Sequence, residues 1–177
     1  MPNPIQTAAS EIFQQGLDLL ESLTPGDYTR QHAAVKSGAI GGHYRHCLEH
    51  FEPLFQANSH TINYDLRKRD PEIETNLGAA IARTYQFSSL CKHLPNLPLG
   101  QQVSVQGKFA YGEDSLTTVQ STLAREWIYA IAHAVHHYAV IGILCNLSGI
   151  QVPEGFGIAP STMDYHRNSH RAENPTA

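Results

Sequence analysis

The chain has 177 residues, of which 41% are hydrophobic. These values predict one globular domain over residues 1–177. A chain of this length is too short for two domains with independent functions. Its net charge of −4 and a pI of about 6.2 argue against a nucleic-acid-binding protein, because neutralising phosphates requires a clustered basic surface. The sequence shows no signal-peptide pattern, and no unbroken apolar run reaches the roughly 18 residues that a membrane span requires. We therefore expect a cytoplasmic protein that binds neither nucleic acid nor membrane.

The first third of the chain predicts two helices separated by a turn-rich segment. Residues 4–23 carry apolar side chains at helical spacing and end at a Thr-Pro-Gly sequence, after which residues 24–38 are rich in turn formers. A second amphipathic pattern covers residues 39–58. Pro53 lies late in this pattern, where it should kink the helix or end its regular hydrogen bonding one turn earlier.

A third helix is predicted over residues 71–94. The sequence Asp70-Pro71-Glu72 supplies an N-cap, a proline at the first helical position and an acid in the first turn, and Pro95 and Pro98 end the pattern. Between residues 102 and 120 the apolar spacing changes and glycines interrupt it, which predicts a short hairpin or an irregular connection.

The most apolar segment of the chain follows this connection. Ser121 or Thr122 can cap a fourth helix that extends to about Leu147 and is apolar on almost every side, so we expect it at the centre of the fold. Glycines and prolines then predict a loop, and residues 164–177 are expected to form a flexible tail. Four helices with one long, hairpin-like connection between the third and the fourth predict an all-α four-helix bundle.

Two clusters of histidine lie on the second and fourth predicted helices. His133 and His137 are four residues apart, so both imidazoles leave one face of the helix a single turn apart, a spacing that suits two ligands of one metal ion. The second helix carries His43, His46 and His50. A third imidazole from this helix would complete a three-nitrogen site with an open position for water or substrate, as in catalytic zinc sites.

Residue spacing alone leaves the third ligand open. On a helical wheel, His43 and His50 lie closer than His46 to the apolar stripe of the second helix, and the three share one stripe about 60° wide. Each of them is therefore a candidate.

The two histidine-bearing segments, residues 39–51 and 125–141, resemble the corresponding helices of the DinB-like superfamily, which includes the YfiT-type hydrolases. The tail Phe156-Gly-Ile-Ala-Pro-Ser-Thr resembles a subgroup in which this domain stands alone, so the resemblance covers essentially the whole chain. It implies a four-helix bundle with one divalent metal ion, bound by one histidine of the second helix and a His-x-x-x-His pair of the fourth. The matching positions are His46, His133 and His137, with His50 as the reserve for His46.

Three other polar residues lie close to these motifs. His43 and His136 are expected beside the metal ligands rather than at the metal. Glu126 precedes His133 by seven residues on the same helical face, so it either serves as a base near the metal or is an exposed or capping acid early in its helix.

The only basic run, Arg67-Lys68-Arg69, also has two interpretations. Guanidinium groups could grip a carboxylate or phosphate of a substrate. The alternative is a solvated loop that pairs with Asp65, Asp70 and Glu72, and we favour this alternative because exposed charge clusters are common in loops.

A metal ion with an open position would lower the pKa of a bound water or thiol and so generate a nucleophile. Characterised DinB-like relatives include transferases and isomerases that use low-molecular-weight thiols, so the resemblance implies a metalloenzyme acting on a small molecule. Thiol S-transfer is the leading reaction and YfiT-type hydrolysis is the alternative, while a non-catalytic bundle that binds metal or ligand is a third hypothesis. Zinc or nickel is expected before iron, although imidazole suits all three metals. The apolar fourth helix also predicts a homodimer.

Overall fold

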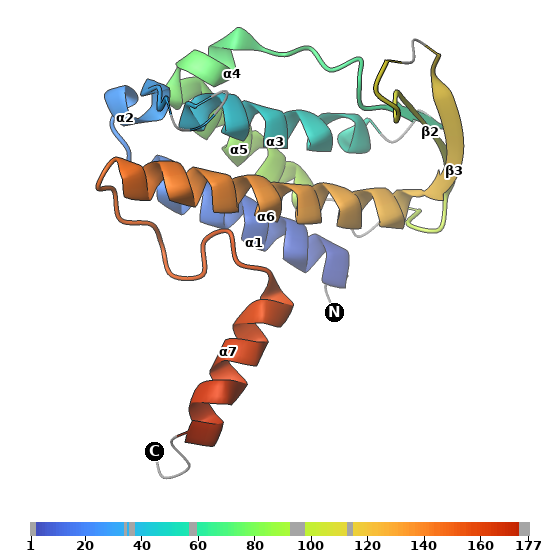
Figure 1. Cartoon of the computed structure of the whole chain (residues 1–177). Coiled ribbons are helices and arrows are strands. Elements are labelled where there is room, and N and C mark those ends of the chain that lie inside the picture. The colour runs from blue at the N-terminus through green and yellow to red at the C-terminus, as the bar shows by residue number, and fades with distance from the viewer. Residues whose placement is uncertain are drawn as a thin grey trace.

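The computed structural model describes residues 3–33, 35, 38–56, 60–92, 98–112 and 115–173, the side chains of residues 170–173 excepted. Within these ranges the chain is predominantly helical and carries a small three-stranded sheet (Figure 1). The helices are α1 (Pro4–Leu20), α2 (Pro25–Thr29), α3 (Ile40–Phe55), α4 (Pro71–Thr75), α5 (Leu77–Cys91), α6 (Leu123–Leu147) and α7 (Pro160–Glu173). The strands are β1 (Thr61–Asn63), β2 (Gln102–Gly107) and β3 (Thr117–Thr122).

The sheet corrects the all-α prediction. Strands β2 and β3 pair antiparallel, with Val105 opposite Val119, so of the two predicted alternatives the segment forms the hairpin. Strand β1 pairs in parallel with the other edge of β2, where Ile62 lies opposite Val105. A three-residue strand is too short to show a period-two pattern in the sequence, so β1 was missed. Its pairing joins the segment after α3 to the hairpin before α6.

The helix predicted over residues 71–94 is divided into two helices. Helix α4 begins at Pro71 with Asp70 as its N-cap, as the sequence predicts. It ends where Asn76 adopts an extended conformation and its side chain caps α5 by accepting the backbone N–H of Ala79. This second N-cap turns the chain and allows α5 to pack against α1.

Three further segments differ from the predictions. Helix α3 continues through Pro53 to Phe55, so of the two effects predicted for this proline, an earlier end of the helix is the one that does not occur. The short helix α2 occupies part of the segment predicted as turns, and a capping box between Thr24 and Asp27 starts it. Helix α7 occupies polar residues predicted as a loop and tail, and it projects away from the other helices (Figure 1). The predicted helix ends at residues 58 and 94, Pro95 and tail residues 174–177 lie outside the described residues.

Helices α3 and α6 lie side by side across the middle of the molecule, and α1 and α5 pack behind them in the view of Figure 1. The core between these helices is aromatic: the ring of Phe13 meets that of Phe51 at 4.8 Å, and Trp127 packs edge-on against Phe55 at 5.1 Å. Trp127 is fully buried, and removing such a side chain from water contributes about 1.5–3 kcal/mol or more to folding. The core thus fixes how α3 and α6 face each other, with their histidines at the edge of the core.

Helix α6 is the element predicted best. Thr122 caps it by accepting the backbone N–H of Arg125, and it ends at Leu147 as expected. By length and composition it is also the one described helix that could cross a membrane, a property that buried core helices share. Here it packs against α3 and α1.

Gly41 allows the backbones of α3 and α4 to come into contact. A Cβ atom at Gly41 would collide with the carbonyl oxygen of Glu74, so a larger residue would separate the two backbones. Tyr28 of α2 strengthens the same contact, because its buried hydroxyl donates to the carbonyl oxygen of Ile73 at 2.7 Å. Glu74 is thereby placed beside Arg45, with 2.9 Å between its carboxylate and Arg45 Nε.

Candidate metal centre

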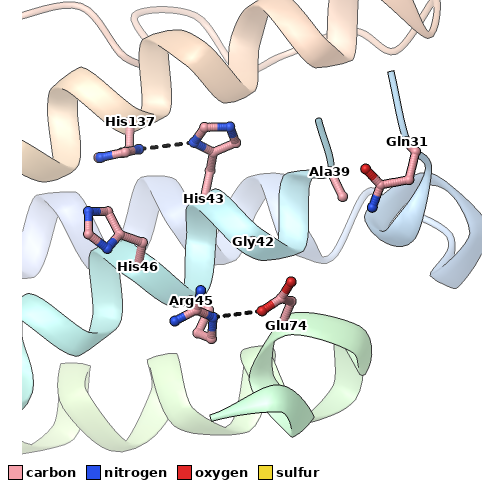
Figure 2. Close-up of a pocket in the computed structure, with 8 residues that line it drawn as sticks. All are labelled: Gln31, Ala39, Gly42, His43, Arg45, His46, Glu74 and His137. Carbon is pink, nitrogen blue, oxygen red and sulfur yellow. Dashed lines mark hydrogen bonds and ion pairs between the residues drawn. The ribbon is translucent and has the colours of Figure 1, made fainter. Parts of the chain in front are cut away.

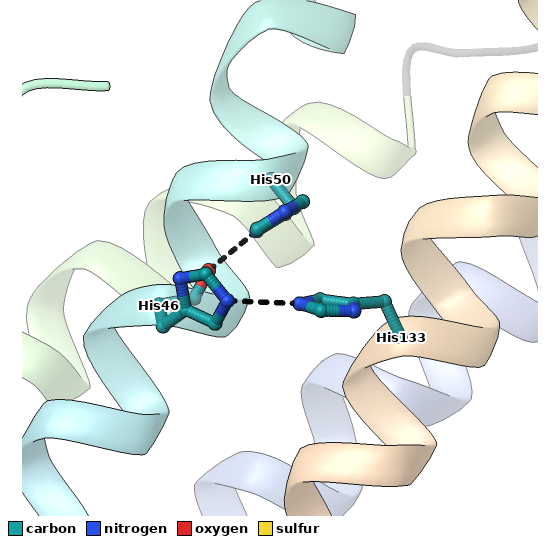
Figure 3. A group of neighbouring side chains, drawn as sticks. All are labelled: His46, His50 and His133. Atoms are coloured by element: carbon teal, nitrogen blue, oxygen red, sulfur yellow. Dashed lines mark hydrogen bonds between the residues drawn. The ribbon is translucent and has the colours of Figure 1, made fainter. Parts of the chain in front are cut away.

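Five histidines from α3 and α6 form a continuous cluster of imidazole rings. Helix α3 contributes His43, His46 and His50, and α6 contributes His133 and His137 (Figures 2 and 3). Within each helix, residues three or four apart share a face. The two helices run antiparallel. His43, the first histidine of α3, therefore contacts His137 of α6, whereas His46 and His50 contact His133, which comes earlier in α6.

The Nε2 atoms of His46 and His133 lie 3.1 Å apart and point at each other across the two helices (Figure 3). One of them carries a proton in this contact; with both deprotonated, their lone pairs would converge between the helices. Two imidazole ligands of tetrahedral zinc, each about 2.05 Å from the ion, have nitrogens roughly 3.3 Å apart. The pair therefore fits two ligands of one metal ion with only a small shift.

His50 completes a three-nitrogen group with these two residues. The ligand atoms of His46, His50 and His133 all lie within 4.8 Å of one another. His50 Nδ1 donates to the carbonyl oxygen of His46 at 2.8 Å, and His50 Nε2 lies 3.1 Å from Nη1 of Arg67. A guanidinium only donates, so the hydrogen-bond pattern assigns the ring proton of His50 to Nδ1 and an acceptor role to Nε2. Both ring nitrogens of this residue are therefore engaged.

His137 lies directly beside the three-nitrogen group. Its ring centroid is 4.5 Å from that of His133 and 4.7 Å from that of His46. Its Nδ1 is 3.1 Å from Nδ1 of His43 (Figure 2), and no hydrogen bond within the described residues engages its Nε2. The structure thus brings His46 and His133 together and places two candidates for the third ligand, His137 and His50, next to them.

Burial makes these imidazoles weak bases. Burial is the main cause that lowers the pKa of His46 to about 2 and that of His50, His133 and His137 to about 4, and the positive charge of Arg67 contributes to these values for the first three. The rings are uncharged at neutral pH, so their lone pairs are available to a metal ion without the loss of a bound proton.

The two histidines expected beside the metal differ in burial. His43 is half-buried, and its Nε2 is buried with no hydrogen-bond partner among the described residues. His136 is exposed, and its ring centroid lies 5.2 Å from that of His137. Both touch His137, and neither belongs to the three-nitrogen group.

Two tyrosines cover another side of the cluster. The ring of Tyr64, just after β1, stacks on His50 with 5.3 Å between centroids, and the ring of Tyr129 stacks on His133 with 5.8 Å. The two tyrosines contact each other at 5.4 Å. They form an aromatic wall on this side of the histidines. Sequence analysis missed Tyr64, because only the pairing of β1 with β2 brings this segment to α6.

Glu126 lies behind this wall. It is 1% exposed, which excludes the interpretation as an exposed acid. Its carboxylate accepts hydrogen bonds from the hydroxyl of Tyr64 at 2.8 Å, from Ser121 Oγ at 2.6 Å and from Arg125 Nη1 at 3.1 Å. Within the described residues Glu126 is therefore connected to the histidines through Tyr64 and makes no hydrogen bond to them.

The structure also corrects the interpretation of the basic run as a solvated loop. The side chain of Arg67 is only 16% exposed and contacts two residues of α3, His50 and Glu49, instead of the acids of its own loop. Glu49 is buried and accepts hydrogen bonds from Arg45 Nη1 at 2.8 Å and from the backbone N–H of Asp70 at 2.9 Å. Lys68 remains exposed, as a loop residue would be.

Three cavities surround the cluster. One of about 380 Å³ opens onto His43, His46 and His137 and is otherwise lined mainly by polar side chains (Figure 2). A second of about 240 Å³ reaches Arg67, and a third of about 470 Å³ lies behind the tyrosine wall. The other residues around the first cavity are Gln31, Ala39, Gly42, Arg45 and Glu74. The first cavity offers the histidine cluster space for a small molecule.

Comparison with known proteins provides one partial similarity. No protein-family model matches the chain, and no solved structure matches it significantly. FK506-binding protein 5 of the fungus Rhizopus delemar is 31% identical over 104 residues, which are 59% of this chain. The aligned part is 27% of the length of that relative. The chain therefore matches only about a quarter of a longer protein. The name of that protein refers to its whole length, not to the part that matches this chain.

Proposed function

We propose that the protein binds one divalent transition-metal ion, zinc or nickel before iron, and uses it to activate a small molecule. The observation that carries this proposal is the 3.1 Å approach of the Nε2 atoms of His46 and His133, which fits two ligands of one ion. His137 is the proposed third ligand, because its Nε2 has no hydrogen bond to lose, and His50 is the reserve.

The chemistry follows from three neutral ligands and an open position. A bound ion would supply Lewis-acid activation of a water or thiol at that position. The cavity beside His46 and His137 admits the small molecule. Thiol S-transfer is the leading reaction: the sulfur bonds to an electrophilic carbon, the leaving group departs with the bonding electrons, and the thiol proton passes to solvent. YfiT-type hydrolysis, with water as the nucleophile, is the alternative.

We also propose that the chain is a stand-alone member of the DinB-like superfamily and that its long helices form a four-helix bundle. The contacts of α3 with α6, of α1 with α5 and of α1 with α6 support this arrangement. The histidines lie on the two helices that the DinB-like pattern requires. A solved structure with bound metal would test both statements.

Elemental analysis of protein purified without a polyhistidine tag tests the proposed metal site. We expect one equivalent of a transition metal in the wild type, and its loss in His46→Ala and in His133→Ala. His136→Ala is the matched control, because this histidine is exposed and, within the described residues, its ring contacts His137 but neither His46 nor His133. A wild type that takes up no metal even after reconstitution with zinc, nickel or iron would contradict the proposal.

The reaction is tested separately on the metal-loaded protein. Several low-molecular-weight thiols are mixed with an aryl chloride, and product formation is compared with that of His133→Ala. Metal-dependent turnover with at least one thiol would support S-transfer. Turnover of amide or ester substrates without any effect of thiols would favour hydrolysis, and metal binding without either reaction would favour a non-catalytic protein.

We further propose a homodimer formed through α6. Three large apolar side chains on this helix are more than half exposed: Ile128, Ile143 and Leu147. A second copy covering them would remove this apolar surface from water. Light scattering coupled to size exclusion, compared with the 19.6 kDa of one chain, tests this proposal.

A further inference from the structure

We infer that the cavity between the β2–β3 hairpin and the start of α6 binds an uncharged aromatic small molecule, at a site separate from the proposed metal centre. No histidine is among the described residues that line this cavity of about 470 Å³, so the inference does not depend on a bound metal ion. The volume lies within the range of roughly 300–1,000 Å³ that is typical of small-molecule sites.

One wall of the cavity is the β2–β3 hairpin, which stands at the start of α6 (Figure 1). Val105 and Val119 lie opposite each other in the antiparallel pair, so both side chains leave the same face of the sheet. Ser121 leaves that face too, because it follows Val119 by two residues. All three line the cavity. The hairpin therefore presents two branched aliphatic side chains to the cavity, with one hydroxyl group at the end nearest α6.

Aromatic rings form the rest of the apolar lining. Tyr64, Phe109 and Tyr129 all line the cavity, and the two tyrosines belong to the wall that covers the histidines. Phe109 is 65% exposed and Val119 is 46% exposed, so large apolar side chains in this hollow face water. A ligand that covers them would remove this surface from water. Because aromatic rings pair favourably with one another in offset or edge-on geometry, a planar aromatic ligand suits this lining better than an aliphatic one.

The charges of the cavity are paired with each other. Of the described residues that line it, two are charged, Arg125 and Glu126, and Arg125 Nη1 donates to Glu126 Oε1 at 3.1 Å. The carboxylate of Glu126 also accepts hydrogen bonds from Tyr64 and Ser121. The guanidinium of Arg125 lies over the ring of Tyr129, with 5.3 Å between Cζ and the ring centroid. A charged ligand would lose its hydration without meeting an unpaired opposite charge, so an uncharged ligand is favoured.

Two fluorescent probes with the same ring system test the inference. N-phenylnaphthylamine is uncharged, whereas anilinonaphthalenesulfonate carries an additional sulfonate group. Both probes fluoresce strongly only in apolar surroundings, so a fluorescence titration measures their binding. We expect N-phenylnaphthylamine to bind saturably, with one equivalent per chain and at least about tenfold more tightly than the sulfonate, because the sulfonate must give up its hydration.

Two substitutions at exposed positions of the cavity assign this binding to it. Phe109→Ala removes one aromatic ring, and Val119→Asp places a carboxylate on the apolar face of the sheet. Each should weaken binding of the uncharged probe by about tenfold or more.

Matched controls lie on the same hairpin outside the cavity. Tyr111→Ala and Leu116→Asp make the same kinds of change at residues that are exposed and do not line the cavity, so they should bind the probe like the wild type. Substitutions of exposed side chains change stability little, and circular dichroism verifies that all four variants are folded.

The possible results separate this inference from its competitors. Binding that is unchanged in Phe109→Ala and Val119→Asp would come from another apolar surface, such as the exposed side chains of α6, and would overturn the inference. A wild type that binds neither probe also overturns it, as would happen if a second copy covered the cavity. Tighter binding of the sulfonate would overturn the uncharged class of ligand.

A titration with a chelator present separates the inference from the proposed metal site. We expect the uncharged probe to bind equally well with and without the chelator, because the lining of the cavity contains none of the proposed metal ligands. A protein that binds the probe but no metal would contradict the proposed function and support this inference. Loss of probe binding on removal of the metal would contradict the separation of the two sites.

Discussion

The hydroxyl of Tyr64 donates to the buried carboxylate of Glu126 at 2.8 Å, and this bond ties the segment after β1 to the first turn of α6. The ring of the same tyrosine stacks on His50. One side chain thus connects the segment after the sheet strand β1, the first turn of α6 and the histidine cluster.

Tyr64→Phe should destabilise the protein by about 1–3 kcal/mol, because it removes a donor from a buried carboxylate. The ring and its stacking on His50 remain in this variant. Tyr85→Phe is a matched control: Tyr85 also donates to a glutamate, Glu21, but in an exposed pair, so its loss should leave stability unchanged. Urea unfolding followed by circular dichroism measures both. Equal effects of the two substitutions would refute the role assigned to the Tyr64–Glu126 bond.

The third ligand can be identified by comparing two single variants. His137→Ala should reduce metal affinity to the level of His46→Ala, a loss of at least about tenfold to a hundredfold, the range reported even for residues that only support a ligand. His50→Ala should retain one equivalent of metal, because both nitrogens of His50 already have hydrogen-bond partners. Competition with a chromophoric chelator measures both affinities. The opposite order would make His50 the ligand.

The metal-free protein should lose stability as the pH falls below about 6.5. The folded-state pKa values of His50, His133 and His137 are lowered from the ordinary 6.5 to about 4 by burial. Between these pH values the unfolded chain binds protons that the folded chain does not, so the free energy of unfolding decreases as the pH decreases. Above pH 6.5 the contribution of these histidines to that free energy is constant. Urea midpoints at pH 7.5 and pH 5, measured with a chelator present, test this expectation.

Two variants show whether the cluster causes this pH dependence. His133→Gln should reduce the difference between the two midpoints, because it removes one buried imidazole. His166→Gln is the control and should leave the difference unchanged, since His166 is exposed on α7, which projects away from the other helices (Figure 1). Identical midpoints at both pH values in the wild type would contradict the expectation.

Phe156 should matter for stability although it lies in a loop. It is 6% exposed and stacks on Tyr138 with 4.7 Å between ring centroids, so Phe156→Ala should destabilise the protein by about 3 kcal/mol. Tyr165→Ala on α7 is the control, because that side chain is 70% exposed and should contribute nothing measurable. Thermal unfolding compares the two. A neutral Phe156→Ala would show that the loop does not belong to the core.

Features that depend on neighbouring residues could be predicted from the sequence. The starts of α4 and α6 are set by side chains that cap the helix a few residues on, Asp70 and Thr122. The same local rule, applied to Asn76, would also have found the division between α4 and α5. The hairpin β2–β3 was one of the two alternatives predicted for its segment, because its pairing connects residues close in the sequence.

Features that depend on distant segments could not be predicted in this way. That both His46 and His50 contact α6 depends on how α3 is rotated by its aromatic core, which a helical wheel does not contain. Arg67 was assigned to a solvated loop because its actual partners, Glu49 and His50, lie on a different helix. The parallel pairing of β1 with β2 is likewise a long-range contact between short segments.

The histidines and the aromatic core are carried by the same two helices, α3 and α6. An ion that binds only when these helices are packed would add to the free energy of unfolding, by about 2.7 kcal/mol when the free ion is at a hundred times its dissociation constant. The melting temperature would then rise with the concentration of the correct ion, and most strongly with the ion that binds most tightly. The resistance of the protein to heating in a crude extract would accordingly depend on which metal ions the extract contains.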